Sequence, residues 1–189
     1  MKKQLLTMGL AFAVAMPLTA NAADYVIDTK GAHASVNFSV SHLGYSFIKG
    51  RFNIFSGDFS YDANDIAASK VNVMIDTTSL DSNHAERDKH IRSADFIDAG
   101  KFSDAKFVSS KVTDKGNGMV EVMGDLTLHG QTQPITIDAQ FIGEGKDPWG
   151  GYRAGFTGTT TLQLKDFGIK AMGMVDTVDM ELVVEGVRK

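Results

Sequence analysis

Residues 35–40 read Ser-Val-Asn-Phe-Ser-Val, a strict alternation of polar and apolar side chains. Because successive side chains of a β-strand point to opposite faces of the sheet, Val36, Phe38 and Val40 are predicted to share one buried face. The same period-two pattern returns over residues 71–75 and 120–128, and further strands are expected near residues 135–142, 152–164 and 175–187. The sequence therefore predicts an all-β, antiparallel fold of about eight strands.

Two irregularities interrupt these predicted strands. In residues 51–61 the apolar phase slips between Phe52 and Phe55, and Gly124 lies inside the strand expected over residues 120–128. An extra residue in one strand shifts its phase, and a glycine inside a strand often marks a bend. The slip is therefore predicted to be a β-bulge, and Gly124 a bulge or a bend.

One segment favours a helix instead of a strand. Residues 83–92 are rich in good helix formers, and Asn83 followed three residues later by Glu86 resembles a capping box. An ion pair is expected between Asp88 and Arg92, which lie four residues apart. The expected helix places four residues along one face, namely Arg87, His90, Ile91 and Ala94.

The predicted sheet has two ways to avoid exposed edges, because it can close into a barrel or split into a sandwich. A closed barrel of eight strands is just wide enough to be filled by its own side chains or to hold one small ligand. The chain contains 12 phenylalanines, and apolar side chains of this kind line both ordinary cores and ligand pockets. Composition alone leaves a filled barrel and a hollow one open.

The N-terminus has the order of a secretory signal peptide. Lys2 and Lys3 precede an apolar run over residues 5–18, and Ala20-Asn21-Ala22 follows as a small-residue cleavage site. Residues 1–22 are therefore predicted to be removed, which leaves residues 23–189 as one domain in the periplasm. A retained membrane anchor is the alternative, although the apolar run is short for a membrane span.

Several chemical functions are not expected from the composition. The chain has no cysteine, which excludes a disulfide scaffold, a thiol nucleophile and a thiolate metal site. Its net charge is −4, without the dense lysine and arginine clusters of proteins that bind nucleic acid. His84 and His90 are six residues apart and do not share a helical face, and neither an HExxH motif nor a Gly-x-Ser-x-Gly motif occurs. We expect no catalytic residue, no metal and no enzyme activity.

Several short motifs follow one another in a recognisable order. They are Phe38-x-Val40-x-His42-x-Gly44, Gly50-Arg51-Phe52, Arg87-Asp88-x-His90, Asp95-Phe96, Gly124-Asp125-Leu126-Thr127-Leu128-His129-Gly130 and Asp166-Phe167-Gly168-Ile169. Taken together they resemble the YceI-like family of secreted, lipocalin-like polyisoprenoid-binding proteins, over residues 24–187.

This resemblance implies an antiparallel eight-stranded lipocalin-like barrel with a short helical segment near its mouth. It also implies a long apolar tunnel for an isoprenoid lipid, with an isoprenoid quinone or a prenyl pyrophosphate as the ligand. No enzyme activity and no cofactor besides the bound lipid are implied. Lys165 departs from the arginine that the family often has before Asp-Phe-Gly. Lysine keeps the charge but lacks the fork of donors that binds phosphate in a bidentate way.

The resemblance and the aromatic content together suggest a set of ligand-binding residues. Phe38, Phe52, Phe107 and Phe156 are expected to line the tunnel, with Phe47, Phe96, Phe167, Met172 and Met174 nearer its ends. His42 and Arg87 are candidates to contact a polar head group, and Trp149 is a candidate to guard the mouth or to meet a membrane surface. Ordinary core packing or the anchoring of a loop is the alternative for each of these side chains.

The leading hypothesis is a soluble periplasmic protein that encloses a polyisoprenoid or an isoprenoid quinone for carriage, storage or sequestration. An outer-membrane barrel is a weaker alternative, since the chain has one tryptophan and four tyrosines and no aromatic residue at its end. A protein-interaction or stress-response module that uses the barrel as a scaffold also remains, because fold does not fix function. Transient membrane contact and a homodimer stay open.

Overall fold

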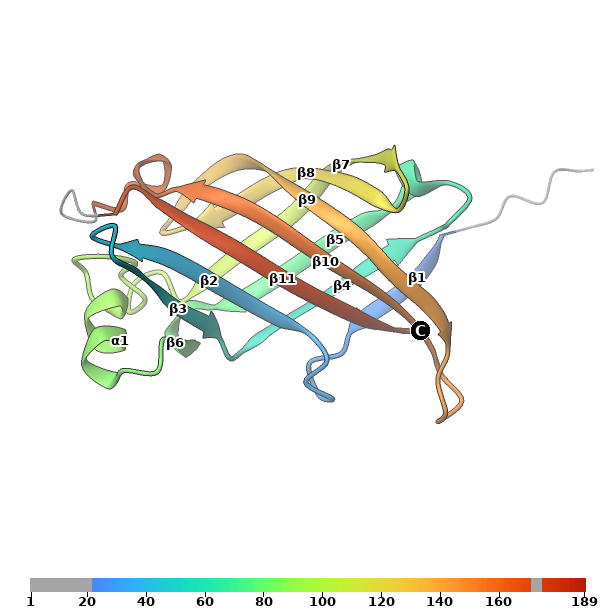
Figure 1. Cartoon of the computed structure of the whole chain (residues 1–189), viewed down its shortest axis with the longest axis horizontal. Helices are drawn as coiled ribbons and strands as arrows, with labels where there is room; N and C mark the ends of the chain where they lie inside the picture. Colours follow the sequence, from blue (N-terminus) through green and yellow to red (C-terminus); the bar gives the residue numbers. More distant parts are fainter. Residues whose placement is uncertain (1–21, 171–174) are drawn as a thin grey trace, which may run out of the picture.

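The computed structural model describes residues 22–170 and 175–189 and consists mainly of long antiparallel strands (Figure 1). The strands in these ranges are β1 (Ala23–Ile27), β2 (Ser35–His42), β3 (Ser46–Phe52), β4 (Phe55–Tyr61), β5 (Lys70–Asp76), β6 (Leu80–Asp81), β7 (Asp104–Gly116), β8 (Met119–Leu128), β9 (Gln131–Lys146), β10 (Tyr152–Gln163) and β11 (Thr177–Arg188). The helices are η1 (Ile66–Ala68), η2 (Thr77–Ser79), α1 (Ala85–Arg92) and η3 (Leu164–Phe167). No helix in the described ranges is long and apolar enough to cross a membrane.

Eight of the strands form a closed ring in the order β1-β4-β5-β7-β8-β9-β10-β11. The ring closes because β1 pairs with β4 on one side and with β11 on the other, so that Val26 lies opposite both Asp58 and Val187. Closure leaves these strands without free edges. The predicted all-β, eight-stranded antiparallel barrel with one short helix is confirmed.

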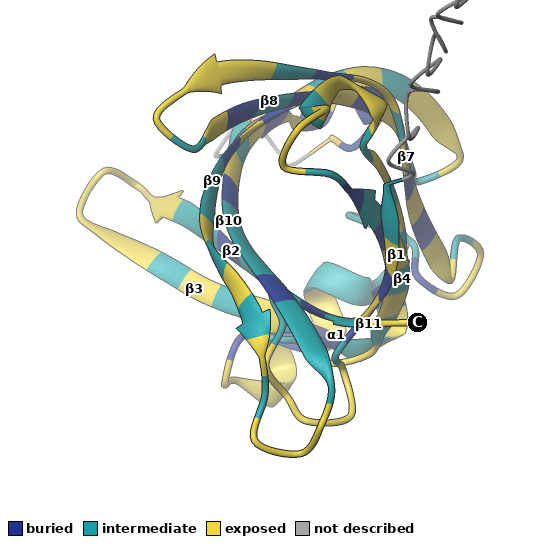
Figure 2. Cartoon of the chain, turned by 90° about the vertical axis from the view of Figure 1, so that its right-hand side faces the viewer, coloured by how far each residue is buried: buried dark blue, intermediate teal, exposed yellow. Residues whose placement is uncertain are grey.

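The remaining strands extend this ring at one end. The first half of β11 pairs with β2, from Asp179 to Val183, and its last residues pair with β1. β2 and β3 form a hairpin, and β6 pairs only with Arg51 and Phe52 of β3. Figure 2 shows that this hairpin projects away from the ring, and Figure 1 places it at the same end of the barrel as α1.

The phase slip between Phe52 and Phe55 is not a bulge, and that prediction is wrong. β3 ends at Phe52 and β4 begins at Phe55, with Asn53 and Ile54 between them. β3 pairs with β2, whereas β4 pairs with β1 and β5. The apolar phase changes because the chain leaves one strand pair and enters another.

The irregularity at Gly124 lies mainly on the neighbouring strand. β8 runs without a break through Gly124, and the register shift falls on β7, where Ser109 pairs with Gly124 and Lys111 with Met123. Gly124 is required for a close approach, because a side-chain methyl there would lie 2.5 Å from Cζ of Phe107. The glycine therefore makes room for an aromatic ring inside the barrel.

Replacing Gly124 by alanine is expected to lower the free energy of unfolding by about 1–3 kcal/mol, the usual cost of overpacking a core. The added methyl would press against the Phe107 ring and the carbonyl of Val108. Gly145→Ala is the matched control in β9, because a methyl at Gly145 would meet nothing within 4 Å. Urea unfolding of both variants measures the difference, and equal stabilities would contradict this account of Gly124.

The predicted helix is present, but its N-terminal cap differs from the expected one. The N-cap residue is His84, whose Nδ1 accepts a hydrogen bond from the backbone N–H of Arg87. Asn83 precedes the cap in the left-handed conformation, with φ of 61°. The expected capping box at Asn83 is therefore wrong by one residue, because this asparagine forms the turn into the helix.

The expected Asp88–Arg92 ion pair is also replaced by other contacts. Asp88 is buried and accepts hydrogen bonds from the backbone N–H and the hydroxyl of Ser82. Arg92 donates instead to the carbonyl oxygens of Thr78, at 3.2 Å, and Leu80, at 2.9 Å. Both side chains hold α1 against the segment that precedes it.

Candidate ligand-binding cavity

A cavity of about 430 Å³ lies inside the barrel. All eight strands of the ring contribute inward-facing side chains to its wall, and β2, β3 and α1 complete it at one end. The wall is mostly valine, isoleucine, leucine and phenylalanine. The volume lies within the range of about 300–1,000 Å³ that is usual for small-molecule sites.

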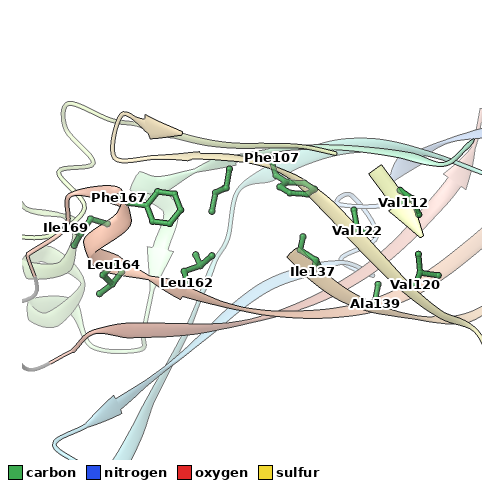
Figure 3. Packing of buried hydrophobic residues seen from close by; sticks show 11 residues of the cluster. Phe107, Val112, Val120, Val122, Ile137, Ala139, Leu162, Leu164, Phe167 and Ile169 are labelled. Carbon is green, nitrogen blue, oxygen red and sulfur yellow. The ribbon is translucent and has the colours of Figure 1, made fainter. Parts of the chain in front are cut away.

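The cavity is elongated along the barrel. β8 lines it from Val120 to Leu128, a path of roughly 26 Å at about 3.3 Å per residue. Figure 3 shows buried side chains spread along this length, with Phe107, Val122 and Ile137 in the middle. A long, narrow and apolar space suits a chain-like hydrocarbon better than a compact polar molecule.

An aromatic cluster packs across the end of the barrel that lies away from α1. Tyr25 stacks on Phe59 with ring centroids 4.9 Å apart, and Phe156 meets Phe59 edge-on at 5.7 Å. Tyr61 packs between Phe141 and Phe156, at 5.4 and 5.2 Å. Desolvation raises the pKa of both tyrosine hydroxyls above the usual value. These five rings form a closely packed, buried cluster at this end of the barrel.

The end of the cavity near α1 carries its arginine and histidine side chains. His42 from β2 and both Arg87 and His90 from α1 belong to the wall there. Arg87 is held in place by Ser82, because its Nε donates to the serine hydroxyl at 2.7 Å and its Nη2 to the serine carbonyl at 2.6 Å. The cavity therefore combines an apolar body with a fixed cation at one end.

Seven of the predicted ligand-binding residues lie in the cavity wall. Phe107 lines its middle and Phe156 its end away from α1, whereas Phe38 and Phe52 of β2 and β3 line the other end together with His42, Arg87 and Phe96. On the predicted face of the helix, Ile91 also reaches the wall, whereas Ala94 lies beyond the helix and is exposed.

Three predicted positions lie elsewhere. Phe47 is 67% exposed, because the register of β3 turns Ile48 inward and Phe47 outward. Phe167 packs in the core with Leu164 and Ile169, as Figure 3 shows, but it does not line the cavity. Trp149 is 78% exposed in the β9–β10 connection, at the end opposite α1. It therefore does not guard the mouth near α1. Met172 and Met174 lie outside the described residues.

Most of the wall comes from aliphatic residues outside the predicted ligand-binding set. Val71, Val73 and Ile75 of β5 are examples, and so is Ile137 of β9. Their signal was the period-two alternation, which shows that a residue faces inward but not whether it meets a cavity or a packed core. The hollow interior depends on how the eight strands close.

A charged cluster ties the loops together at the end of the barrel away from α1. Arg153 of β10 donates to Asp28 at 2.7 Å, to Asp147 at 2.8 Å and to Glu185 at 2.6 Å. Its hydrogen bonds hold the pKa of Asp28 and Asp147 below the usual range, and the carboxylates raise the pKa of Arg153. His33 Nδ1 adds a contact of 3.0 Å to Asp28.

Three residues of the same cluster lie close enough together to coordinate a metal ion. Ligand atoms of Asp28, His33 and Glu185 lie within 4.8 Å of one another. However, the guanidinium of Arg153 already bonds to both carboxylates and supplies the positive charge between them. The cluster therefore acts as a structural tie, which joins the β1–β2 and β9–β10 connections to β11.

The tie at Arg153 predicts a dependence of stability on pH. The pKa of Asp28 and of Asp147 is lower in the folded chain than in the unfolded chain. As the pH falls below about 4, the usual pKa of an aspartate, the unfolded chain therefore binds more protons than the folded chain. Their contribution to the free energy of unfolding is complete above that pH and is lost below it.

Replacing Arg153 by methionine is expected to remove most of this contribution. The melting temperature of the variant should lie several degrees below that of the wild type near neutral pH, and the two should converge in acid. Lys115→Met is the matched control, because Lys115 is exposed and its ion pair with Glu121 is worth little. Thermal melts from about pH 7 to about pH 2 test this, and a gap that stays constant would contradict the proposed linkage.

Both the sequence and the fold of the chain match those of known proteins. The sequence profile of the YceI-like domain matches residues 25–186. The UPF0312 protein of Vibrio vulnificus (strain YJ016) is 72% identical over 189 residues, which cover 100% of both chains. A crystal structure of a Campylobacter jejuni YceI protein has a TM-score of 0.72 at 27% identity, and the match covers 79% of this chain and 90% of that one.

A more distant structure shares the fold. A polyisoprenoid binding domain from Saccharophagus degradans, described as implicated in plant cell wall breakdown, has a TM-score of 0.63 at 15% identity. The match covers 89% of this chain and 99% of that one. The profile and the close relatives confirm the resemblance carried by the ordered motifs, and the chain belongs to the YceI-like family.

Proposed function

We propose that this protein encloses the chain of a polyisoprenoid lipid or an isoprenoid quinone in its barrel, for carriage, storage or sequestration. The observation that carries the proposal is the elongated cavity, which is mostly apolar along its body and has an arginine and two histidines at one end. The name of the Saccharophagus degradans domain, which shares the fold, supports the same class of ligand. The expected signal peptide supports a site of action in the periplasm.

Binding of this kind rests on the burial of hydrocarbon. Each Å² of apolar surface removed from water contributes about 25 cal/mol, so a chain that fills the cavity needs few polar contacts. The predicted positions Phe38, Phe52, Phe107 and Phe156 would supply aromatic contacts along the chain. A ligand held by burial alone is not activated for reaction, which favours a binding protein over an enzyme.

The polar head of the ligand is proposed to lie at the end near α1. Arg87 and His90 are there, together with His42, and all three carry donors that suit a quinone carbonyl or a phosphate oxygen. Lys165 is exposed on η3 and does not line the cavity. Binding of the head group is therefore not proposed to involve Lys165, the position at which this chain departs from the family pattern.

A series of isoprenoids of increasing chain length tests the proposal. With one head group throughout, the affinity should rise at least tenfold, or about 1.4 kcal/mol, for each added isoprene unit until the cavity is full. Competition with a fluorescent fatty acid probe gives the dissociation constants. Affinity that does not change with chain length would contradict binding by burial, and no binding at all would favour an interaction module.

A further inference from the structure

Three large apolar side chains are exposed at the tip of the β2–β3 hairpin. Leu43 is 55% exposed, Tyr45 88% and Phe47 67%. We call these three residues the hairpin tip. Apolar side chains grouped on a protruding element mark an interaction site more often than single scattered ones do.

The backbone conformation of the turn does not favour a leucine at position 43. Leu43 and Gly44 both have positive φ, of 54° and 75°, and Tyr45 donates its backbone N–H to the His42 carbonyl at 3.0 Å. A leucine is strained in the left-handed region, where glycine or asparagine is the usual choice. A bulky apolar residue therefore occupies a position where a small or polar one would fold more easily.

The hairpin tip is continuous with the cavity. His42 and Leu43 belong to the cavity wall although both are exposed, and the hairpin projects from the barrel at the end that carries α1 (Figures 1 and 2). Trp149, the other strongly exposed aromatic residue among those described, lies at the opposite end. A surface that binds the hairpin tip therefore also lies against the end of the cavity near α1.

We propose that the hairpin tip inserts into the interface of a lipid bilayer and sets the end of the cavity near α1 against the membrane. This inference rests on the proposed function, because an isoprenoid lipid resides in the bilayer and has to leave it to enter the cavity. Aromatic and leucine side chains are the types that bury at a membrane interface. A second copy of the chain would cover the tip equally well but would also obstruct the adjoining end of the cavity.

A double variant, Tyr45→Ser with Phe47→Ser, tests the inference. Neither side chain lines the cavity, so binding of an isoprenoid added from ethanol should be unchanged. Trp149→Ser with Ile142→Ser is the control, because both of these apolar side chains are exposed elsewhere. The probes are vesicles of phosphatidylethanolamine and phosphatidylglycerol, with and without an isoprenoid quinone. Co-sedimentation measures docking, and the protein-bound quinone measures uptake.

The double variant should bind vesicles at least tenfold more weakly than the wild type and extract the quinone at least tenfold more slowly, while the control behaves as the wild type. Equal vesicle binding by the double variant and the wild type would overturn the inference and leave the proposed function standing. A wild-type dimer that the double variant dissociates, without vesicle binding, would assign the tip to a second copy. Loss of quinone binding from every source would refute the proposed function, and co-sedimentation alone would then decide on docking.

Discussion

Replacing Ala139 by tryptophan should lower the affinity for a long isoprenoid about 70-fold. Ala139 is a small residue in the cavity wall on β9, and an indole in its place would fill part of the space for the ligand. If it displaces about 100 Å² of ligand contact, the loss is about 2.5 kcal/mol at about 25 cal/mol per Å². Competition titration at equal protein concentration measures the change.

Ile142→Trp is the matched control for this substitution. It places the same side chain on the same strand, but Ile142 is 63% exposed on the outside of the barrel. Its affinity for the isoprenoid should equal that of the wild type. Val122→Phe, a milder filling of the same cavity from β8, provides a second test if the tryptophan variant folds poorly. A folded variant of either kind that binds as tightly as the wild type would contradict the location of the site.

Replacing Phe59 by alanine should lower the free energy of unfolding by about 3–5 kcal/mol, the usual cost of removing a buried aromatic ring. Phe59 is 5% exposed and lies between the rings of Tyr25 and Phe156. Its ring also covers Gly186, where a side-chain methyl would lie 2.6 Å from Cζ. Its loss would loosen the contact between β4, β1 and β11 at the closure of the barrel.

Urea unfolding measures this loss, with Phe47→Ala as the control. Phe47 is the same residue type but is exposed, so its removal should change the stability by less than about 0.5 kcal/mol. Phe59→Ala should also release isoprenoid faster, because the aromatic cluster no longer packs across its end of the barrel. If the two variants are equally stable, the aromatic cluster does not stabilise the closure of the barrel.

The alternation of residues 35–40 and of similar segments was sufficient to predict the strands, because local side-chain direction follows from strand geometry. The closure was not predictable in the same way. β11 pairs with β2 along its first half and with β1 at its end. Both pairings join residues that are more than a hundred positions apart in the sequence, so no local pattern indicates them. The phase slip at Phe52 was visible in the sequence, yet only the pairing shows that it separates two strands.

The positions of the candidate site residues could also be predicted only in part from the sequence. Phe47 shares its strand face with Lys49 and Arg51, and this alternation indicates an outward position, whereas its aromatic side chain by itself favours the interior. Trp149 belongs to a loop, and no local pattern tells at which end of a barrel a loop lies. The contacts of Arg153 with Asp28 and Glu185 join distant parts of the chain and left no signal in the sequence.

The most direct test of the central claim is native mass spectrometry of the protein, purified without detergent from the cells that produce it, followed by organic extraction of any bound species. The account predicts one isoprenoid lipid per protein, lost in Ala139→Trp and retained in Ile142→Trp. A mass equal to that of the protein alone, with no uptake when isoprenoid quinones and prenyl phosphates are supplied, would contradict it.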